Sequence, residues 1–294
     1  MDNWFLLILG SALALGLYDF TKKTGVQNNR VMPVLFIATV CGTLTLIAIS
    51  LITGRFVATF SCTWQTWCLV WLKSCIVAAS WIAGYFALHD MPISIVAPIR
   101  TSASVWATLG GLVLLGECPT LWQAIAMAII FAGYFCFTVI GKAEGFSWRN
   151  RGIKMVVAAT LLGAASGIYD RVLMHRLHLP VDTVQMHFSI DLVIIIGLCW
   201  LLQPHCKFLR EDCKFTWRWC IPAIGILLIL ADWLYFNAVA NPDAQIGMLS
   251  ILRRMSVCVS FFCGGCFFHE KYLLKKTGAL AILLLGVLLF ALVK

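Results

Sequence analysis

Three arginines lie inside long apolar stretches of this sequence: Arg100, Arg253 and Arg254. Arg100 follows Pro92 by eight residues, which is about 12 Å along a helix, deep within a hydrocarbon core about 30 Å thick. A charged side chain at such a depth costs roughly 2.5–3.5 kcal/mol on insertion scales, so it faces protein or water. A planar guanidinium is suited to bidentate binding of an anion. The arginines are therefore candidates for binding an anionic group of a substrate.

Acidic residues in similar stretches give these arginines an alternative role, which is to form ion pairs that hold helices together. The ionisable candidates are Asp19, Asp170, Asp191, Asp232 and His187. Asp232 lies in the middle of a stretch and is the foremost candidate for carrying a coupled proton, because burial favours the neutral carboxyl group. Asp19 and Asp170 each follow a tyrosine at the expected end of a helix, as a proton carrier or an interfacial residue would. Asp191 and His187 share a helix face, either as a proton relay or as partners in hydrogen bonds between helices.

Four aromatic residues occur at close spacing in two of the apolar stretches. They are Trp81, Tyr85, Trp233 and Tyr235. Aromatic walls would suit a cavity for a partly apolar substrate. The alternative is that at least half of these rings face lipid.

The composition requires membrane-spanning elements to position these residues. Apolar residues make up 61% of the 294 residues and charged residues 12%, whereas soluble domains carry about 25% charged residues. Only helices are realistic spanning elements here, because an open sheet edge leaves unpaired backbone groups in hydrocarbon. We expect an all-α membrane protein with ten transmembrane helices near residues 4–20, 31–52, 67–88, 93–116, 121–141, 153–173, 185–203, 217–239, 245–268 and 275–293. The first stretch lacks a basic leader and is expected to be a true helix rather than a signal peptide.

The 13 cysteines do not indicate a metal or redox centre. Most of them lie in apolar stretches, where a free cysteine behaves as a small hydrophobic residue. Cys263 and Cys266 have CxxC spacing, but they lie in the middle of an expected helix. We expect no metal and no cofactor. The net charge of +9 comes mostly from loops and does not indicate nucleic-acid binding.

The sequence contains an internal repeat. Gly16-Leu17-Tyr18-Asp19 recurs 151 positions later as Gly167-Ile168-Tyr169-Asp170, and Ile99-Arg100 recurs 153 positions later as Leu252-Arg253. The repeat divides the chain into residues 1–142 and 153–294, each with five expected helices. Because five is odd, the second half enters the membrane inverted relative to the first. Inverted repeats are common in secondary transporters, whose substrate sites lie near the midplane between the halves.

The run Pro92–Arg100 and the later Leu115-Gly116-Glu117 resemble the EamA-like transporters of the drug/metabolite transporter superfamily. The resemblance covers nearly the whole chain and implies a ten-helix carrier whose cavity is bounded by helices 1, 3 and 4 and by helices 6, 8 and 9. It does not identify a substrate. The second half departs from the first, because Phe268-His269-Glu270 stands in place of Leu-Gly-Glu and the region of Met248 in place of Pro98.

Basic residues are unequally divided between the two sides of the expected helices. Of the 22 lysines and arginines, one set of alternate loops holds 14, including Lys22, and the other set holds 5, including Lys73 and Arg171. Basic loops normally face the cytoplasm, so this division favours termini on the opposite side. The resemblance implies cytoplasmic termini instead, and both orientations stay open.

The leading functional hypothesis is a secondary active transporter of a small metabolite, either an exporter or an exchanger, in the cell inner (plasma) membrane. Its expected partners are a small-molecule substrate and the lipid bilayer, with the chain as a monomer or homodimer. No nucleotide-binding Walker A motif is present, so ATP-driven pumping is unsupported. The alternatives are an intramembrane enzyme, for which no HExxH or GxSxG motif is found, and a lipid-linked sugar flippase. We expect a protein that is not an enzyme.

Overall fold

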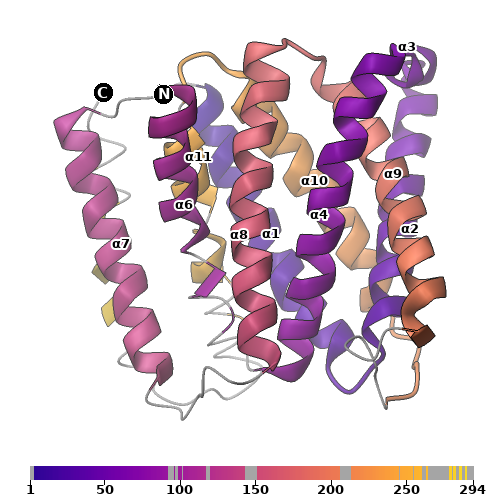
Figure 1. Ribbon diagram of the computed structural model, residues 1–294, viewed down its shortest axis with the longest axis horizontal. Helices are drawn as coiled ribbons and strands as arrows, with labels where there is room; N and C mark the ends of the chain where they lie inside the picture. The colour runs from indigo at the N-terminus through magenta and orange to yellow at the C-terminus, as the bar shows by residue number, and fades with distance from the viewer. Residues whose placement is uncertain are drawn as a thin grey trace.

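The computed structural model describes residues 3–91, 99–100, 102–116, 120–142, 151–205, 213–244, 246–253 and 255–259, with isolated positions at 96, 263 and between 278 and 289. Within these ranges every regular element is a helix. The longer helices are α1 (Asn3–Val26), α2 (Val31–Ile52), α4 (Trp64–Asp90), α7 (Leu121–Lys142), α8 (Arg151–Arg171), α9 (Val181–Leu202) and α10 (Cys220–Ala240). The shorter ones are α3 (Phe56–Phe60), α6 (Ala103–Gly110) and α11 (Ile246–Arg253). Figure 1 shows them as one bundle of steeply inclined helices.

Six of these helices, α1, α2, α4, α8, α9 and α10, are long and apolar enough to cross a membrane. They correspond to the first three and the sixth to eighth expected spans, and α2 has the expected bounds. In the fourth span, α6 continues into a π-helical turn at Gly111–Leu115, and α7 lies in the fifth. The ninth span is described mainly as α11, and most of the tenth lies outside the described residues. The structure therefore confirms an all-helical membrane protein and six of the ten spans.

Helix α1 extends six residues beyond its expected end at residue 20. It stops at Val26, and Asn28 takes a left-handed backbone conformation with φ of 54°, which asparagine tolerates better than most residues. The side-chain amide of Asn29 then donates to the carbonyl oxygens of Gly25 at 3.1 Å and Thr216 at 2.7 Å. The expectation that Asp19 ends the first helix was therefore wrong, since Asp19 lies about two turns inside it.

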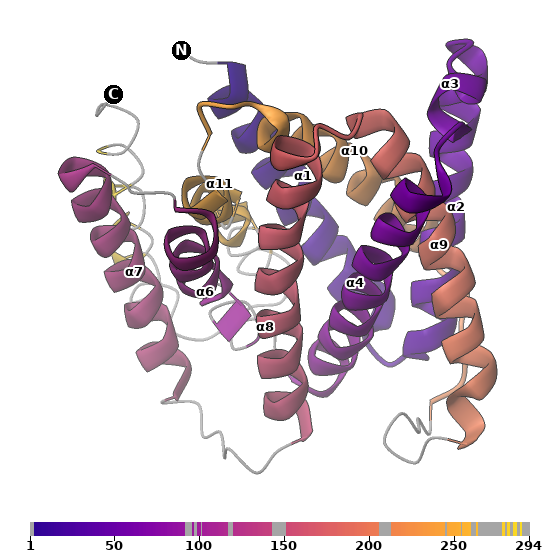
Figure 2. The same cartoon turned by 45° about the horizontal axis from the view of Figure 1, so that its top comes forward.

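The helices pack in related pairs. Helix α1 packs against α10 and α4 against α8, and the contacts of α2 with α10 are matched by contacts of α9 with α4. Likewise, α6 packs against α8 and α11 against α1. Both views show α4 and α8 side by side (Figures 1 and 2). Helices from the two expected halves are therefore interleaved, and the core lies between them.

Helices α2 and α10 cross at two glycines. A Cβ atom on Gly225 would lie 2.0 Å from the carbonyl oxygen of Ala38 and 2.6 Å from the amide nitrogen of Gly42. A Cβ atom on Gly42 would lie 2.8 Å from the carbonyl oxygen of Gly225. Small residues let transmembrane helices approach closely and gain van der Waals contact. The backbones of α2 and α10 therefore touch here with no side chain between them.

Two basic side chains bind the carboxyl ends of neighbouring helices. Lys23 donates to the carbonyl oxygens of Leu88 at 2.7 Å and Met91 at 3.2 Å. Arg171 donates to the carbonyl oxygens of Val239 at 2.8 Å and Asn241 at 2.9 Å. These carbonyls belong to the last turns of α4 and α10, which lack partners within their own helices. Arg171 is buried, so its assignment to a loop at the membrane surface was wrong.

Candidate functional site

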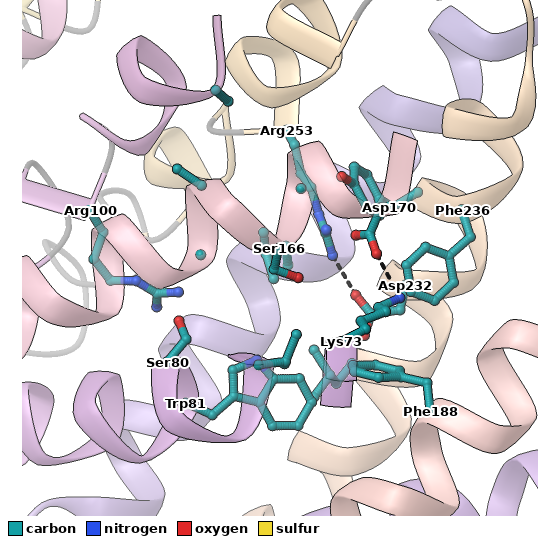
Figure 3. A pocket seen from close by; sticks show the side chains of 18 of the residues that line it. Lys73, Ser80, Trp81, Arg100, Ser166, Asp170, Phe188, Asp232, Phe236 and Arg253 are labelled. Carbon is teal, nitrogen blue, oxygen red and sulfur yellow. Dashed lines mark hydrogen bonds and ion pairs between the residues drawn. The ribbon is translucent and has the colours of Figure 1, made fainter. Parts of the chain in front are cut away.

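An open cavity lies between helices α1, α4, α6, α8, α9, α10 and α11, with about 870 Å³ of empty space including the part open to the surroundings. Its lining combines charged, hydroxyl and aromatic side chains. The principal ones are Tyr18, Lys73, Ser80, Trp81, Arg100, Ser166, Asp170, Phe188, Asp232, Tyr235, Phe236 and Arg253. Figure 3 shows that the side chains labelled there converge from several helices on one space.

A buried ion pair joins α4 to α8 in this cavity. The Lys73 ammonium nitrogen lies 2.8 Å from a carboxylate oxygen of Asp170, and the two side chains are only 1% and 5% exposed. The same nitrogen lies 4.2 Å from the ring centre of Phe188 and 3.8 Å from that of Phe236, both within the range of cation–π attraction. The ammonium group is therefore enclosed by one carboxylate and two aromatic faces (Figure 3).

Lys73 was not among the expected site residues. Its assignment to the basic residues of loops was wrong, because Lys73 lies in the third turn of α4 and is buried. Its position within the expected span 67–88 was the available signal. Phe188 and Phe236 carried no comparable signal, since the chain has 19 phenylalanines, most of them in apolar stretches.

A second ion pair joins α10 to α11. A terminal nitrogen of Arg253 lies 2.5 Å from a carboxylate oxygen of Asp232, and the guanidinium carbon lies 4.0 Å from the ring centre of Tyr235. Arg253 therefore forms an ion pair between two helices, which was the alternative role for the arginines. Its neighbour Arg254 lies outside the described residues.

A third group of charges lies beside the cavity around Asp19. The Lys22 ammonium nitrogen is 2.8 Å from a carboxylate oxygen of Asp19, whereas the nearer terminal nitrogen of Arg100 is 3.8 Å from the same oxygen. Lys22 also lies over the rings of Tyr18 at 4.2 Å and Tyr85 at 5.1 Å. Lys22 is buried within α1, so its assignment to a loop was wrong. Asp19 is thus closer to Lys22 than to Arg100, whose guanidinium lines the cavity.

The described lining carries an excess of positive charge. Lys73, Arg100 and Arg253 contribute three cations, and Asp170 and Asp232 contribute two carboxylates, which leaves a net charge of +1. Two of the cations are matched by the two short ion pairs. Arg100 has the longest ion-pair distance of the three, so an anion entering the cavity would meet this guanidinium with the smallest loss of existing contacts.

The remaining expected residues lie outside the cavity lining. Tyr85 is buried behind it, in contact with Lys22. Trp233 is 43% exposed on the outer surface of α10, as expected for a ring facing lipid. His187 bonds to the backbone oxygen of Phe60 at 3.0 Å, and Asp191 accepts a hydrogen bond from Ser74 at 3.3 Å. Each of the last two residues therefore has its own partner on a neighbouring segment.

The cavity brings together Trp81, Tyr235, Arg100, Arg253, Asp170 and Asp232 from among the expected residues. In the part of the chain that the structure describes, no group of three His, Cys, Asp or Glu side chains could hold a metal ion. The lining is suited to binding a charged, partly apolar small molecule, with guanidinium and ammonium groups for anions and aromatic faces for apolar parts.

Comparison with known proteins finds one matching family model and a similar fold. Residues 2–139 match the model of the EamA-like transporter family. A solved structure described only as "Crystal structure of protein" is similar over 99% of this chain and 98% of its own, with a TM-score of 0.74 and 15% sequence identity. At that identity the likeness shows the fold alone. No curated protein matches the sequence.

Proposed function

We propose that this chain, whose residues 2–139 match the model of the EamA-like transporter family, is a secondary active transporter of a small metabolite with an anionic group. It works as an exporter or exchanger in the inner (plasma) membrane by alternating access between two inverted halves. The observation that carries this proposal is the charged cavity, to which both expected halves contribute buried side chains.

The Lys73–Asp170 pair supports a site between the halves. Lys73 belongs to the first expected half and Asp170 to the second, and their charged groups are 2.8 Å apart. Desolvating two charges costs several kcal/mol per ion, which a single good contact offsets only in part. Apolar side chains would hold the two helices together without this desolvation cost, so the presence of these charges favours a function in binding.

The helix packing supports the inverted relationship. The repeat offset of about 150 residues equates α1 with α8, α2 with α9 and α4 with α10. When each helix is replaced by its counterpart, the α1–α10 contact becomes the α8–α4 contact, and the α2–α10 contact becomes the α9–α4 contact. Two structurally related halves can rock between mirror-related states around a site at their interface.

The net charge of the lining supports an anionic substrate group. An anion near Arg100 would neutralise the surplus positive charge of the described lining residues. Trp81 and Phe188, which meet edge to face at a ring distance of 6.1 Å, provide an apolar wall for the rest of the substrate. We therefore expect a small molecule with one anionic group and an apolar part.

Transport can be tested with the purified protein in liposomes. A panel of radiolabelled amino acids, sugar phosphates, nucleotide sugars and aromatic carboxylates would be offered to loaded proteoliposomes and to protein-free liposomes. At least one anionic compound should exchange across the membrane only when the protein is present. Hydrolysis or modification of a compound without flux would contradict the proposal and favour an enzyme.

Arg100→Gln tests the proposed anion contact. This variant should reduce exchange of the anionic compound by at least tenfold, because it removes the least tightly paired cation of the cavity. Arg55→Gln is the matched control, since the Arg55 side chain is 72% exposed outside the cavity. If exchange by Arg100→Gln equals exchange by the control, Arg100 does not bind the substrate.

A further inference from the structure

The Lys73 ammonium group is held in two independent ways. One is the Asp170 carboxylate at 2.8 Å, and the other is the pair of aromatic rings of Phe188 and Phe236 at 4.2 and 3.8 Å. The electron-rich ring faces attract a cation whether or not a carboxylate is ionised beside it. The rings therefore continue to stabilise a charged Lys73 when Asp170 gains a proton.

The two ion pairs of the cavity differ in the number of rings that hold the cation. Arg253, paired with Asp232 at 2.5 Å, lies over the single ring of Tyr235, whereas Lys73 lies over the two rings of Phe188 and Phe236. Protonation of Asp170 therefore leaves its cation with more aromatic contacts than protonation of Asp232 would leave to Arg253.

Helices α9, α10 and α11 each place a side chain beside the Lys73–Asp170 pair. Asp232 from α10 and Arg253 from α11 act on both members of the pair, and their opposite charges offset each other. Helix α9 presents the uncharged Phe188. Asp170 lines the open cavity, so a proton can reach it from water there. Asp191, by contrast, is bonded to Ser74 outside the cavity lining.

We propose that Asp170 is the proton-coupling residue and that Lys73 is the charge it switches, an inference that rests on the proposed transport function. One proton from cavity water adds to the Asp170 carboxylate and gives a neutral carboxyl group. The Lys73 ammonium then remains between Phe188 and Phe236 without its carboxylate partner. The cavity then carries one more positive charge, which the anionic group of the substrate near Arg100 offsets, so one proton and one substrate anion are bound together and cross together, outward when the outward substrate gradient exceeds the inward proton gradient.

Infrared spectroscopy of the protein in lipid nanodiscs tests the proton site without any substrate. With isotopically labelled aspartate, acidification protonates several carboxylates, and the Asp170 component of the protonated-carboxyl band is the difference between the wild type and Asp170→Asn. Asp191→Asn is the control, because it removes the contribution of another buried carboxyl group outside the cavity and should leave the Asp170 component in place. An acid titration of Asp170→Asn identical to that of the wild type would overturn the proposal.

The aromatic faces are tested by Phe188→Leu/Phe236→Leu, which keeps the ion pair and nearly preserves apolar volume. Once Asp170 is neutral, the ammonium group is held by the rings alone and gains from closer contact with them, so loss of the rings should move the midpoint of the Asp170 component to lower pH by up to about one unit. This variant also covers the case in which Asp170→Asn does not fold. A midpoint equal to that of the wild type would show that the rings do not support the switch.

The coupling itself is tested with the compound identified in the liposome panel. A pH gradient should drive its accumulation by the wild type and by the control Asp191→Asn, whereas Asp170→Asn should not accumulate it. If the compound moves but its accumulation ignores the pH gradient, the coupling proposal fails and the transport proposal stands. If no compound moves, the transport proposal fails, and the infrared titration still decides whether Asp170 is the protonated group.

Discussion

Removing either member of the Lys73–Asp170 pair should destabilise the protein more than removing both. Lys73→Met leaves the Asp170 carboxylate buried without a cation, and Asp170→Asn leaves the Lys73 ammonium without a carboxylate, at side-chain exposures of 5% and 1%. Breaking a buried pair by deleting one partner costs about 3–5 kcal/mol. If the two effects were independent, the double variant would lose about 6–10 kcal/mol.

The double variant Lys73→Met/Asp170→Asn leaves no unpaired charge, so its loss should be only about 1–3 kcal/mol, from the changed packing and the new amide group. Reversible unfolding of the four proteins in detergent, followed by tryptophan fluorescence, gives the coupling free energy directly. Acidification should recover part of the stability of Lys73→Met, because a protonated Asp170 no longer needs a cation.

A double-mutant cycle on the exposed pair Arg55–Asp182 is the matched control. Its charged atoms are 3.7 Å apart, and its side chains are 72% and 44% exposed, so its coupling should be below about 1 kcal/mol. The reasoning is refuted if the losses of the two single variants of Lys73 and Asp170 simply add in the double variant. It is also refuted if the buried and exposed pairs give equal coupling.

Two further predictions concern packing and the aromatic residues. Gly225→Ala should lower the free energy of unfolding by about 1–3 kcal/mol, because its Cβ atom would lie 2.0 Å from the Ala38 carbonyl oxygen. Thermal unfolding measures the loss. The control Gly163→Ala should show a much smaller effect, because the nearest atom to its Cβ would be 3.5 Å away. Trp81→Ala should weaken exchange of the transported anion in proteoliposomes, whereas Trp233→Ala on the outer surface should not, and equal effects would contradict the placement of the substrate beside Trp81.

Helices were predictable from the sequence where hydropathy is uninterrupted. The expected span 31–52 matches α2 because polar residues flank a continuous apolar stretch. The end of α1 was not predictable in this way, since Asp19, Lys22 and Lys23 resemble the start of a loop. They lie within a helix because Asp19 pairs with Lys22, and Lys23 binds the carbonyls at the end of α4. Such compensation depends on contacts that are distant in sequence.

The sequence was sufficient to predict which charged residues line the site, but not which residues they pair with. The cost of burying Arg100, Arg253 and Asp232 identified them as functional candidates, and all three line the cavity. The partner of each charge follows from helix packing, which the spacing of residues along the chain does not determine. Lys73 shows this best, since its carboxylate lies 97 positions away on another helix.

The contact of Gly42 with Gly225 limits how the helices can move past one another. Where two backbones touch without intervening side chains, sliding along either axis would drive larger neighbours into the gap. Rotation about the point of contact meets no such obstacle. The crossing of α2 and α10 is thus placed to serve as a pivot in the proposed alternating-access movement, in which the distance between these two helices would stay fixed.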